Sequence, residues 1–136
     1  MQFAGMNYLA IVAAAIAAYV FSAIYYTALS TPWMKAAELK KGRKPAAPWL
    51  PFVIAAVADL VMAWVLAGTI GHLGIGQVTF KNGVISGAFI WFGFVLTTIA
   101  VNYGFAGRKP LLTVIDAAHW LCVLLLMGAI IGLFGV

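Results

Sequence analysis

The chain has 136 residues, of which 65% are hydrophobic and 8% charged, and its formal net charge is +5. Soluble domains carry about 25% charged residues, so the composition excludes a soluble globular domain, a disordered chain and a nucleic-acid-binding module. Because a membrane-spanning helix takes about 20 apolar residues, four such helices use most of this length. The sequence therefore predicts an all-α, four-helix transmembrane bundle that forms a single domain over residues 1–136.

Four long apolar runs follow one another along the chain, at residues 7–29, 51–72, 83–105 and 111–133. They are apolar on all faces, which favours helices over the alternating strands of about ten residues that build a membrane barrel. All five prolines lie outside these runs or at the first residue of one, where helices tolerate proline. The first run is longer than the apolar core of a signal peptide, so we expect it to remain as a spanning helix.

The basic residues gather in two of the connections. Residues 30–50 hold five of the eight Lys and Arg residues, 106–110 hold two, and 74–82 hold one. Cytoplasmic loops are enriched in Lys and Arg, so we expect the two basic connections in the cytoplasm and both termini on the outer face. This pattern predicts a multi-pass membrane protein with a defined orientation, and we expect it in the bacterial cytoplasmic (inner) membrane.

The first connection has features of a membrane interface. Trp33 and Trp49 flank it, as expected of interfacial aromatic residues, and residues 34–41 are compatible with a short surface helix. The basic stretch 35–44 either attracts anionic lipid headgroups or serves only as a topology signal. The lipid bilayer is thus the partner that the sequence predicts, and nucleic acid is not.

Several polar side chains lie inside the predicted spans. A carboxylate there costs on the order of 2.5–3.5 kcal/mol, so such residues usually face the bundle interior and are functional. Asp116 and His119 share one helix face, as do Thr98 and Asn102, because residues three or four apart are neighbours on a helix. In the predicted orientation all these groups fall in the cytoplasmic half, and the candidate ligand-binding residues are Asp59, Asn102, Asp116, His119, Tyr25, Tyr26 and Thr98.

Each candidate also has a purely structural interpretation. Asp59 is either a hydrogen-bonded structural carboxylate or a functional one, and we expect it to depend on partners such as Asn102 or His119. Because Asp59 is the deeper carboxylate, we expect its loss to damage folding or activity more than the loss of Asp116. Asp116 is close enough to Arg108 or Lys109 to form an ion pair, and His119 is typical of a packing and hydrogen-bonding partner.

No catalytic or metal-binding pattern stands out. Repeated histidine spacing of the kind that binds metal is missing from the sequence, and no nucleophile has an evident base beside it. We therefore predict no metal, no cofactor and no catalytic residues. An intramembrane enzyme is the least supported class.

Small residues gather at the other end of the predicted bundle. Gly83 with Gly87 and Gly128 with Gly132 are GxxxG pairs, which allow helix backbones to approach closely. These pairs either pack on each other within one chain or form a contact between copies, and we expect a homo-oligomer. Small residues at the outer end and large polar residues at the inner end favour a bundle that is splayed toward the cytoplasm, with a cavity there.

Two hypotheses of different classes follow. The first is a small membrane protein that binds a small polar ligand or a proton at this polar cluster, as a transporter would, with Asp59 as the central acceptor. The second is a structural or accessory membrane subunit whose polar cluster only locks the helices together. They differ in whether Asp59 faces a wet cavity or a dry helix contact.

Short motifs along nearly the whole chain also carry a family resemblance. They are Met6-Asn7-Tyr8-Leu9-Ala10, Tyr25-Tyr26-Thr27, Trp33-Met34, Thr97-Thr98, Asn102-Tyr103, Gly107-Arg108, Ile115-Asp116 and Leu126-Met127-Gly128-Ala129-Ile130. With these motifs the chain resembles the bacterial membrane-protein family labelled "domain of unknown function 1761".

The chain departs from that family in two places. Members typically carry Trp-Tyr and then Ser-Pro in the first helix, where this chain has Tyr25-Tyr26 and Thr27-Ala28. The family's fourth-helix histidine falls at about Trp120, with His119 beside it. The resemblance implies the four-helix fold and the polar positions, and it implies no chemistry.

Overall fold

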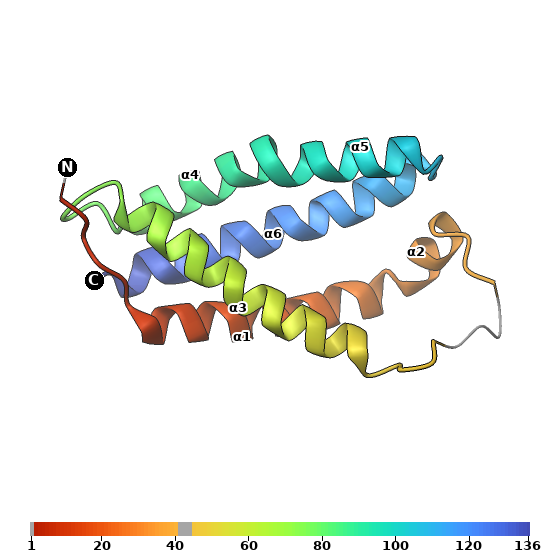
Figure 1. Cartoon of the computed structure of the whole chain (residues 1–136), viewed down its shortest axis with the longest axis horizontal. Coiled ribbons are helices and arrows are strands. Elements are labelled where there is room, and N and C mark those ends of the chain that lie inside the picture. Colours follow the sequence, from red (N-terminus) through yellow and green to blue (C-terminus); the bar gives the residue numbers. More distant parts are fainter. Residues whose placement is uncertain (1, 41–44) are drawn as a thin grey trace.

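The structure is a computed structural model, and it describes residues 2–40 and 45–136. Its described part contains helices and no strands, which confirms the predicted all-α class (Figure 1). Four helical spans are long and apolar enough to cross a membrane, and the third of them is made of three consecutive segments. The elements are α1 (Tyr8–Ala28), α2 (Ser30–Ala36), α3 (Leu50–Gly71), α4 (Phe80–Ile90), η1 (Trp91–Leu96), α5 (Thr97–Phe105) and α6 (Pro110–Phe134).

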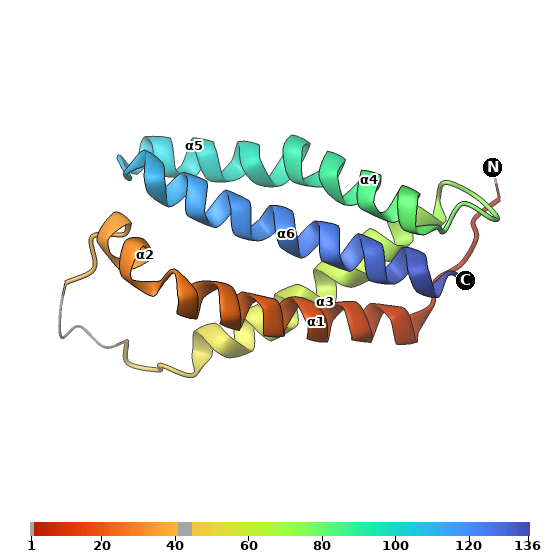
Figure 2. The ribbon, with the colours of Figure 1, turned by 180° about the vertical axis from the view of Figure 1, so that it is seen from behind.

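Helix α6 lies between α1 on one side and the α4–η1–α5 span on the other, in both views of the ribbon (Figures 1 and 2). Helix α3 packs across α1. Both termini and the α3–α4 connection lie at one end of the bundle, whereas α2 and the α5–α6 turn lie at the other end (Figure 1). The sequence predicts that these two ends face opposite sides of the membrane.

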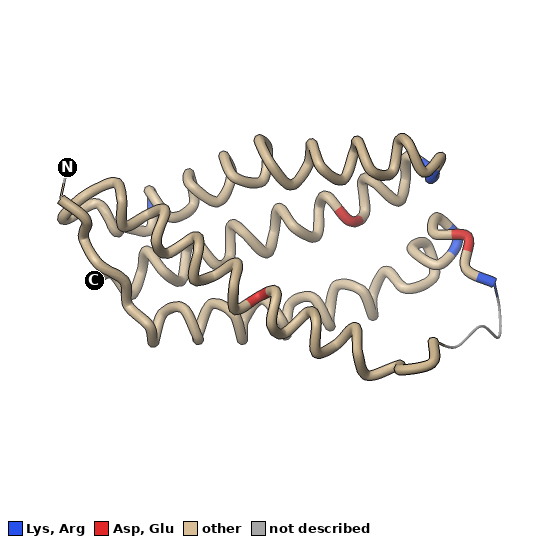
Figure 3. Tube along the Cα trace, in the orientation of Figure 1, with Lys and Arg blue, Asp and Glu red and all other residues tan. Residues whose placement is uncertain are grey.

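The charged residues follow the same division. Lys35 and Lys40 belong to α2 and the segment after it, and Arg108 and Lys109 lie in the α5–α6 turn, so these four mark one end (Figure 3). Lys81, at the start of α4, lies at the end that holds the termini. We call the first of these the basic end and the second the terminal end.

The short helix of the first connection differs from its prediction. It was expected over 34–41 and is found at Ser30–Ala36, almost directly after α1. It ends there because Glu38 adopts a positive φ of 55°, which interrupts helical geometry. Residues 41–44, which complete the predicted basic stretch 35–44, lie outside the described residues.

Side chains at the helix starts satisfy backbone groups that a bilayer could not hydrate. The side-chain oxygen Oδ1 of Asn7 accepts from the Ala10 backbone amide at 3.2 Å, and its side-chain nitrogen Nδ2 donates to the Gly135 carbonyl at 3.2 Å. Asn7 therefore caps α1 and also ties the beginning of the first span to the end of the last. Thr79 caps α4 in the same way, through the Asn82 amide.

The third span is interrupted by a π-helical segment, η1. A π turn holds one extra residue and shifts the faces of the helix before and after it. The indole nitrogen of Trp91, at the start of this segment, donates to the Ala117 carbonyl of α6 at 2.7 Å. This hydrogen bond joins α6 to the third span near the middle of the bundle.

Helices α4 and α6 meet through their glycines at the terminal end. A Cβ atom placed on Gly83 would overlap the Gly128 carbonyl, and one on Gly128 would overlap the Gly83 carbonyl. A Cβ on Gly132 would overlap the Thr79 carbonyl, and one on Gly87 would come within 2.5 Å of the Leu124 carbonyl oxygen. The two GxxxG pairs therefore pack on each other within one chain, which was one of the two predicted alternatives.

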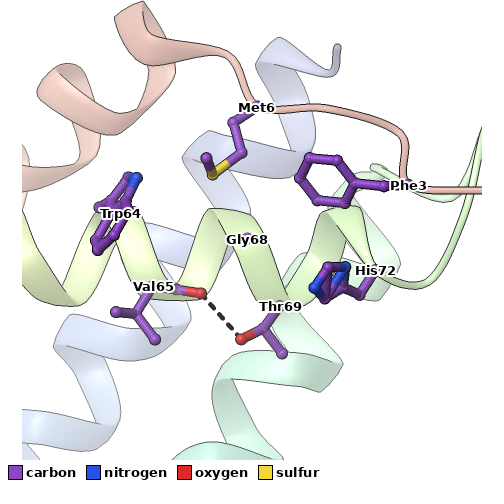
Figure 4. A pocket seen from close by; sticks show the side chains of 7 residues that line it. All are labelled: Phe3, Met6, Trp64, Val65, Gly68, Thr69 and His72. Atoms are coloured by element: carbon purple, nitrogen blue, oxygen red, sulfur yellow. Dashed lines mark hydrogen bonds between the residues drawn. The ribbon is translucent and has the colours of Figure 1, made fainter.

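The N-terminal segment covers the end of α3 (Figure 4). The Ala4 amide donates to the Gly71 carbonyl at 3.0 Å, and the Phe3 ring meets the His72 ring edge-on with centroids 4.8 Å apart. A mostly apolar hollow of about 390 Å³ lies beside them, and Met6 and Trp64 line it. Since this hollow contains no carboxylate, the candidate residues lie elsewhere.

The glycine contact makes a direct prediction. Gly128→Ala should destabilise the protein by about 1–3 kcal/mol or more, because the new methyl group meets backbone atoms that cannot move aside. Gly104→Ala is the matched control: a Cβ there meets nothing within 4 Å, and alanine stabilises a helix by about 0.5–1 kcal/mol relative to glycine. Thermal unfolding in detergent measures both. Equal melting temperatures for the two variants would contradict the close α4–α6 contact.

Candidate functional site

Asp116 is the centre of a hydrogen-bonded cluster at the basic end. Its side chain is buried, and three neutral donors reach its two oxygens. The Tyr26 hydroxyl donates to Oδ1 at 2.8 Å, the Trp33 indole to the same oxygen at 3.0 Å, and the Tyr103 hydroxyl to Oδ2 at 2.6 Å. We call these four residues the Asp116 cluster. Because they come from α1, α2, α5 and α6, the cluster holds four elements together.

The expectation that Asp116 forms an ion pair with Arg108 or Lys109 is wrong. The Lys109 ammonium pairs instead with Glu38 at 3.4 Å on the protein surface, and the Arg108 guanidinium donates to the Ala37 carbonyl at 3.5 Å. Tyrosine and tryptophan donors are close enough to satisfy Asp116 without a cation. Tyr25 supports the same region, because its hydroxyl donates to the Ile115 carbonyl at 2.7 Å.

His119 lies one turn further along α6 and has a different environment. Its Nε2 is 2.7 Å from the Ser22 hydroxyl oxygen. The Ser22 hydroxyl also lies 2.9 Å from the Ala18 carbonyl oxygen, so this serine joins the imidazole to the backbone of α1. The other ring nitrogen, Nδ1, is enclosed by protein atoms and has no hydrogen-bond partner among the described residues.

Aromatic rings surround this imidazole. The ring of Trp120 is 4.6 Å away, that of Tyr26 is 4.7 Å away and that of Tyr25 is 5.3 Å away, centroid to centroid. The sequence prediction that His119 is a packing and hydrogen-bonding residue matches these contacts. The same contacts also fix the ring so that one edge borders the space next to Asp59.

That space is a cavity of about 650 Å³ between α1, α3 and α6. Asp59 on α3 and His119 on α6 both line it, together with Ser22 and Tyr26 of α1. Pro51 at the start of α3 also borders it, so the cavity extends from the basic end of the bundle to the depth of Asp59, roughly 12 Å along the helix at 1.5 Å per residue. We call it the Asp59 cavity.

Asp59 is only 2% exposed, although it sits on the half of α3 that departs from the bundle. From Pro51 to Ala58 no residue of α3 is buried, whereas Asp59, Ala63 and Leu66 are. No side chain in the described part of the protein forms a hydrogen bond or ion pair with its carboxylate. The expected bonds to Asn102 or His119 are therefore wrong, and the Asp59 carboxylate borders the cavity instead.

Two of the predicted site residues lie away from the others. Thr98 and Asn102 are on the exposed face of α5, where the Thr98 hydroxyl donates to the Phe94 carbonyl of its own helix. The extra residue of the π segment changes which face of the third span meets the bundle, and the sequence gives no sign of that change. Of the seven candidates, Asp59, Tyr26 and His119 line the cavity, Tyr26 and Asp116 belong to the cluster, and Tyr25 supports it.

Sequence reasoning missed three residues that the structure brings to these sites. Trp33 was interpreted as an interfacial anchor, and its indole binds Asp116 instead. Ser22 precedes Tyr26 by one helical turn, a spacing that places both on one face of α1 and was available in the sequence. Tyr103 was noted in a motif, but nothing in its spacing indicated that it would reach Asp116.

Fold and composition together define a multi-pass α-helical membrane protein. The chain belongs to the family described as "Protein of unknown function (DUF1761)", whose family model matches residues 9–132. This match confirms the family resemblance and covers nearly the whole chain. No curated protein and no solved structure matches the sequence.

Substitution of the two carboxylates should change the free energy of unfolding by different amounts. Asp116→Asn should lower the free energy of unfolding by about 1.5–3 kcal/mol, because the amide loses the negative charge and its NH2 group faces the donor or donors at one of the two oxygen positions. Asp59→Asn should change it by less than about 1 kcal/mol, because no described side chain loses a partner. This reverses the expectation from depth alone, in which Asp59 mattered more for folding.

Thermal unfolding in one detergent measures both variants. Tyr103→Phe should lower the melting temperature, whereas the control Tyr8→Phe should not, since Tyr8 is exposed and its hydroxyl has no partner among the described residues. A larger loss for Asp59→Asn than for Asp116→Asn would contradict the assignment.

Proposed function

We propose that this protein binds a small polar ligand or a proton in the Asp59 cavity and acts as a small transporter of the bacterial cytoplasmic membrane. The observation that carries this proposal is a buried carboxylate that lines a cavity and has no partner among the described residues. A charged group inside a bilayer is costly, so one left unpaired marks a ligand or ion pathway. The cavity volume, about 650 Å³, falls within the range of about 300–1,000 Å³ of small-molecule sites.

The difference between Asp116 and Asp59 supports the proposal. Three protein donors already reach the two oxygens of Asp116, whereas no described side chain reaches those of Asp59. The cluster thus fits the alternative function, a structural or accessory subunit whose polar residues only lock the helices. We assign that locking role to Asp116, Tyr26, Trp33 and Tyr103, and the ligand role to Asp59, with His119 on the opposite wall.

The orientation of the protein remains a prediction. The concentration of basic residues at one end supports placing that end in the cytoplasm. In a Cys122→Ala background, a cysteine at Ala46 should resist an impermeant maleimide added to whole cells and react after permeabilisation. A cysteine at Gln77, in the connection at the terminal end, should react without permeabilisation. Labelling of Ala46→Cys in intact cells would reverse the orientation.

That the protein forms a homo-oligomer remains a prediction, but the GxxxG pairs no longer support it. The GxxxG pairs are used inside the chain, so they offer no surface to a second copy. The exposed face of α5 holds the Asn102 amide, which has no hydrogen-bond partner in the described part. An unpaired amide facing lipid favours a partner helix, so we propose that copies meet along α5.

Water access tests the proposed ligand site directly. In the Cys122→Ala background, Ala55→Cys should react with a charged, membrane-impermeant methanethiosulfonate reagent, because Ala55 lines the cavity. Ile54→Cys is the matched control: it lies at the same depth, and its exposed side chain faces lipid, where a thiol does not ionise. Inverted membrane vesicles give the reagent access to the cytoplasmic side. Failure of Ala55→Cys to react faster than Ile54→Cys would contradict a wet cavity.

A further inference from the structure

We propose that the Asp59 cavity takes a monovalent organic cation, an amine or quaternary ammonium with an apolar body. This inference rests on the proposed function and gives the chemical class of its ligand. It follows from three properties of the cavity walls: their charge, their hydrogen-bonding capacity and their aromatic rings.

Among the described residues, those that line the cavity include one carboxylate and no basic side chain other than the imidazole of His119. Of the described cations at the basic end, Lys109 pairs with Glu38 and Arg108 donates to the Ala37 carbonyl, whereas Lys35 and Lys40 are not among the residues that line the cavity. His119 is hydrogen-bonded through its Nε2 to the Ser22 hydroxyl, and it forms no ion pair with Asp59 among the described residues. A ligand in the cavity therefore meets a negative charge that nothing in the described part of the protein neutralises.

Three of the five hydroxyl groups on the walls already donate to protein acceptors, and the other two belong to Thr27 and Ser30. Tyr19 donates to the Phe52 carbonyl at 3.3 Å, Ser22 to the Ala18 carbonyl and Tyr26 to Asp116. An anionic ligand would need donors of this kind, and it would also be repelled by Asp59. A ligand that brings its own positive charge needs only the carboxylate.

Aromatic rings supply the rest of the surface. Tyr19 and Tyr26 on α1, Phe52 on α3 and Trp120 on α6 border the cavity from three helices. Aromatic faces attract cations, most strongly where water is excluded, and they also cover apolar groups. A metal ion fits less well, because hard cations require six or more oxygen ligands and the cavity offers one carboxylate. The volume of about 650 Å³ likewise suits an organic molecule rather than a bare ion.

The test uses a charged probe and its neutral isostere. Benzyltrimethylammonium carries the positive charge, and neopentylbenzene has the same shape with carbon in place of nitrogen. Isothermal titration of the full chain in nanodiscs, corrected with empty nanodiscs, should show saturable binding of the ammonium only. Asp59→Asn should weaken that binding by at least about tenfold, and Asp59→Glu should retain most of it. Phe52→Leu should weaken it by about 2–5-fold.

The outcomes distinguish a failure of the cation proposal from a failure of the proposed function on which it rests. Equal binding of the ammonium by wild type and Asp59→Asn, or equal binding of both probes by wild type, overturns the cation proposal. No measurable binding of the ammonium also overturns it. In each case the reactivity of Ala55→Cys decides separately whether a water-accessible ligand site exists. Asp59→Asn is expected to fold, and its melting temperature provides the check.

Discussion

Each polar group inside this bundle must find donors, acceptors or water, because hydrocarbon offers none. The two intramembrane carboxylates meet that requirement in different ways. Asp116 recruits three neutral donors from three neighbouring elements, and this arrangement holds α1, α2 and α5 against α6. Asp59 has no such donors among residues 2–40 and 45–136, and it borders a cavity. This difference indicates that Asp116 is structural and that Asp59 is available to a ligand.

The two ends of the bundle are built from residues of opposite size. At the terminal end, Gly83 and Gly128 bring the α4 and α6 backbones into contact, and the Asn7 amide closes the bundle by reaching the Gly135 carbonyl. At the basic end, tyrosine, tryptophan and phenylalanine side chains keep the helices further apart. A bundle held together firmly at one end and spread at the other encloses a cavity that opens toward the spread end. That shape fits access from one side of the membrane.

The sequence was sufficient for the fold and for only part of the site. Long apolar runs and the positions of prolines such as Pro51 and Pro110 determine four helices and where they begin. Helix periodicity correctly placed Asp116 and His119 on one face. It could not show that Tyr103 would donate to Asp116 or that Ser22 would form a hydrogen bond with His119. The π segment rotates the faces of α5 relative to those of α4, and no residue in the sequence predicts this segment. The exposed position of Asn102 was therefore not predictable.

The central claim is that Asp59 faces a solvated cavity while Asp116 is fully occupied by protein donors. An experimental structure of the protein in lipid nanodiscs, at a resolution that shows ordered water, tests this claim most directly. The account predicts density for water or a bound ligand beside the Asp59 carboxylate, and the Tyr26, Trp33 and Tyr103 donors alone around Asp116. A hydrogen bond from another helix to Asp59, or an acyl chain filling the space beside it, would contradict the account.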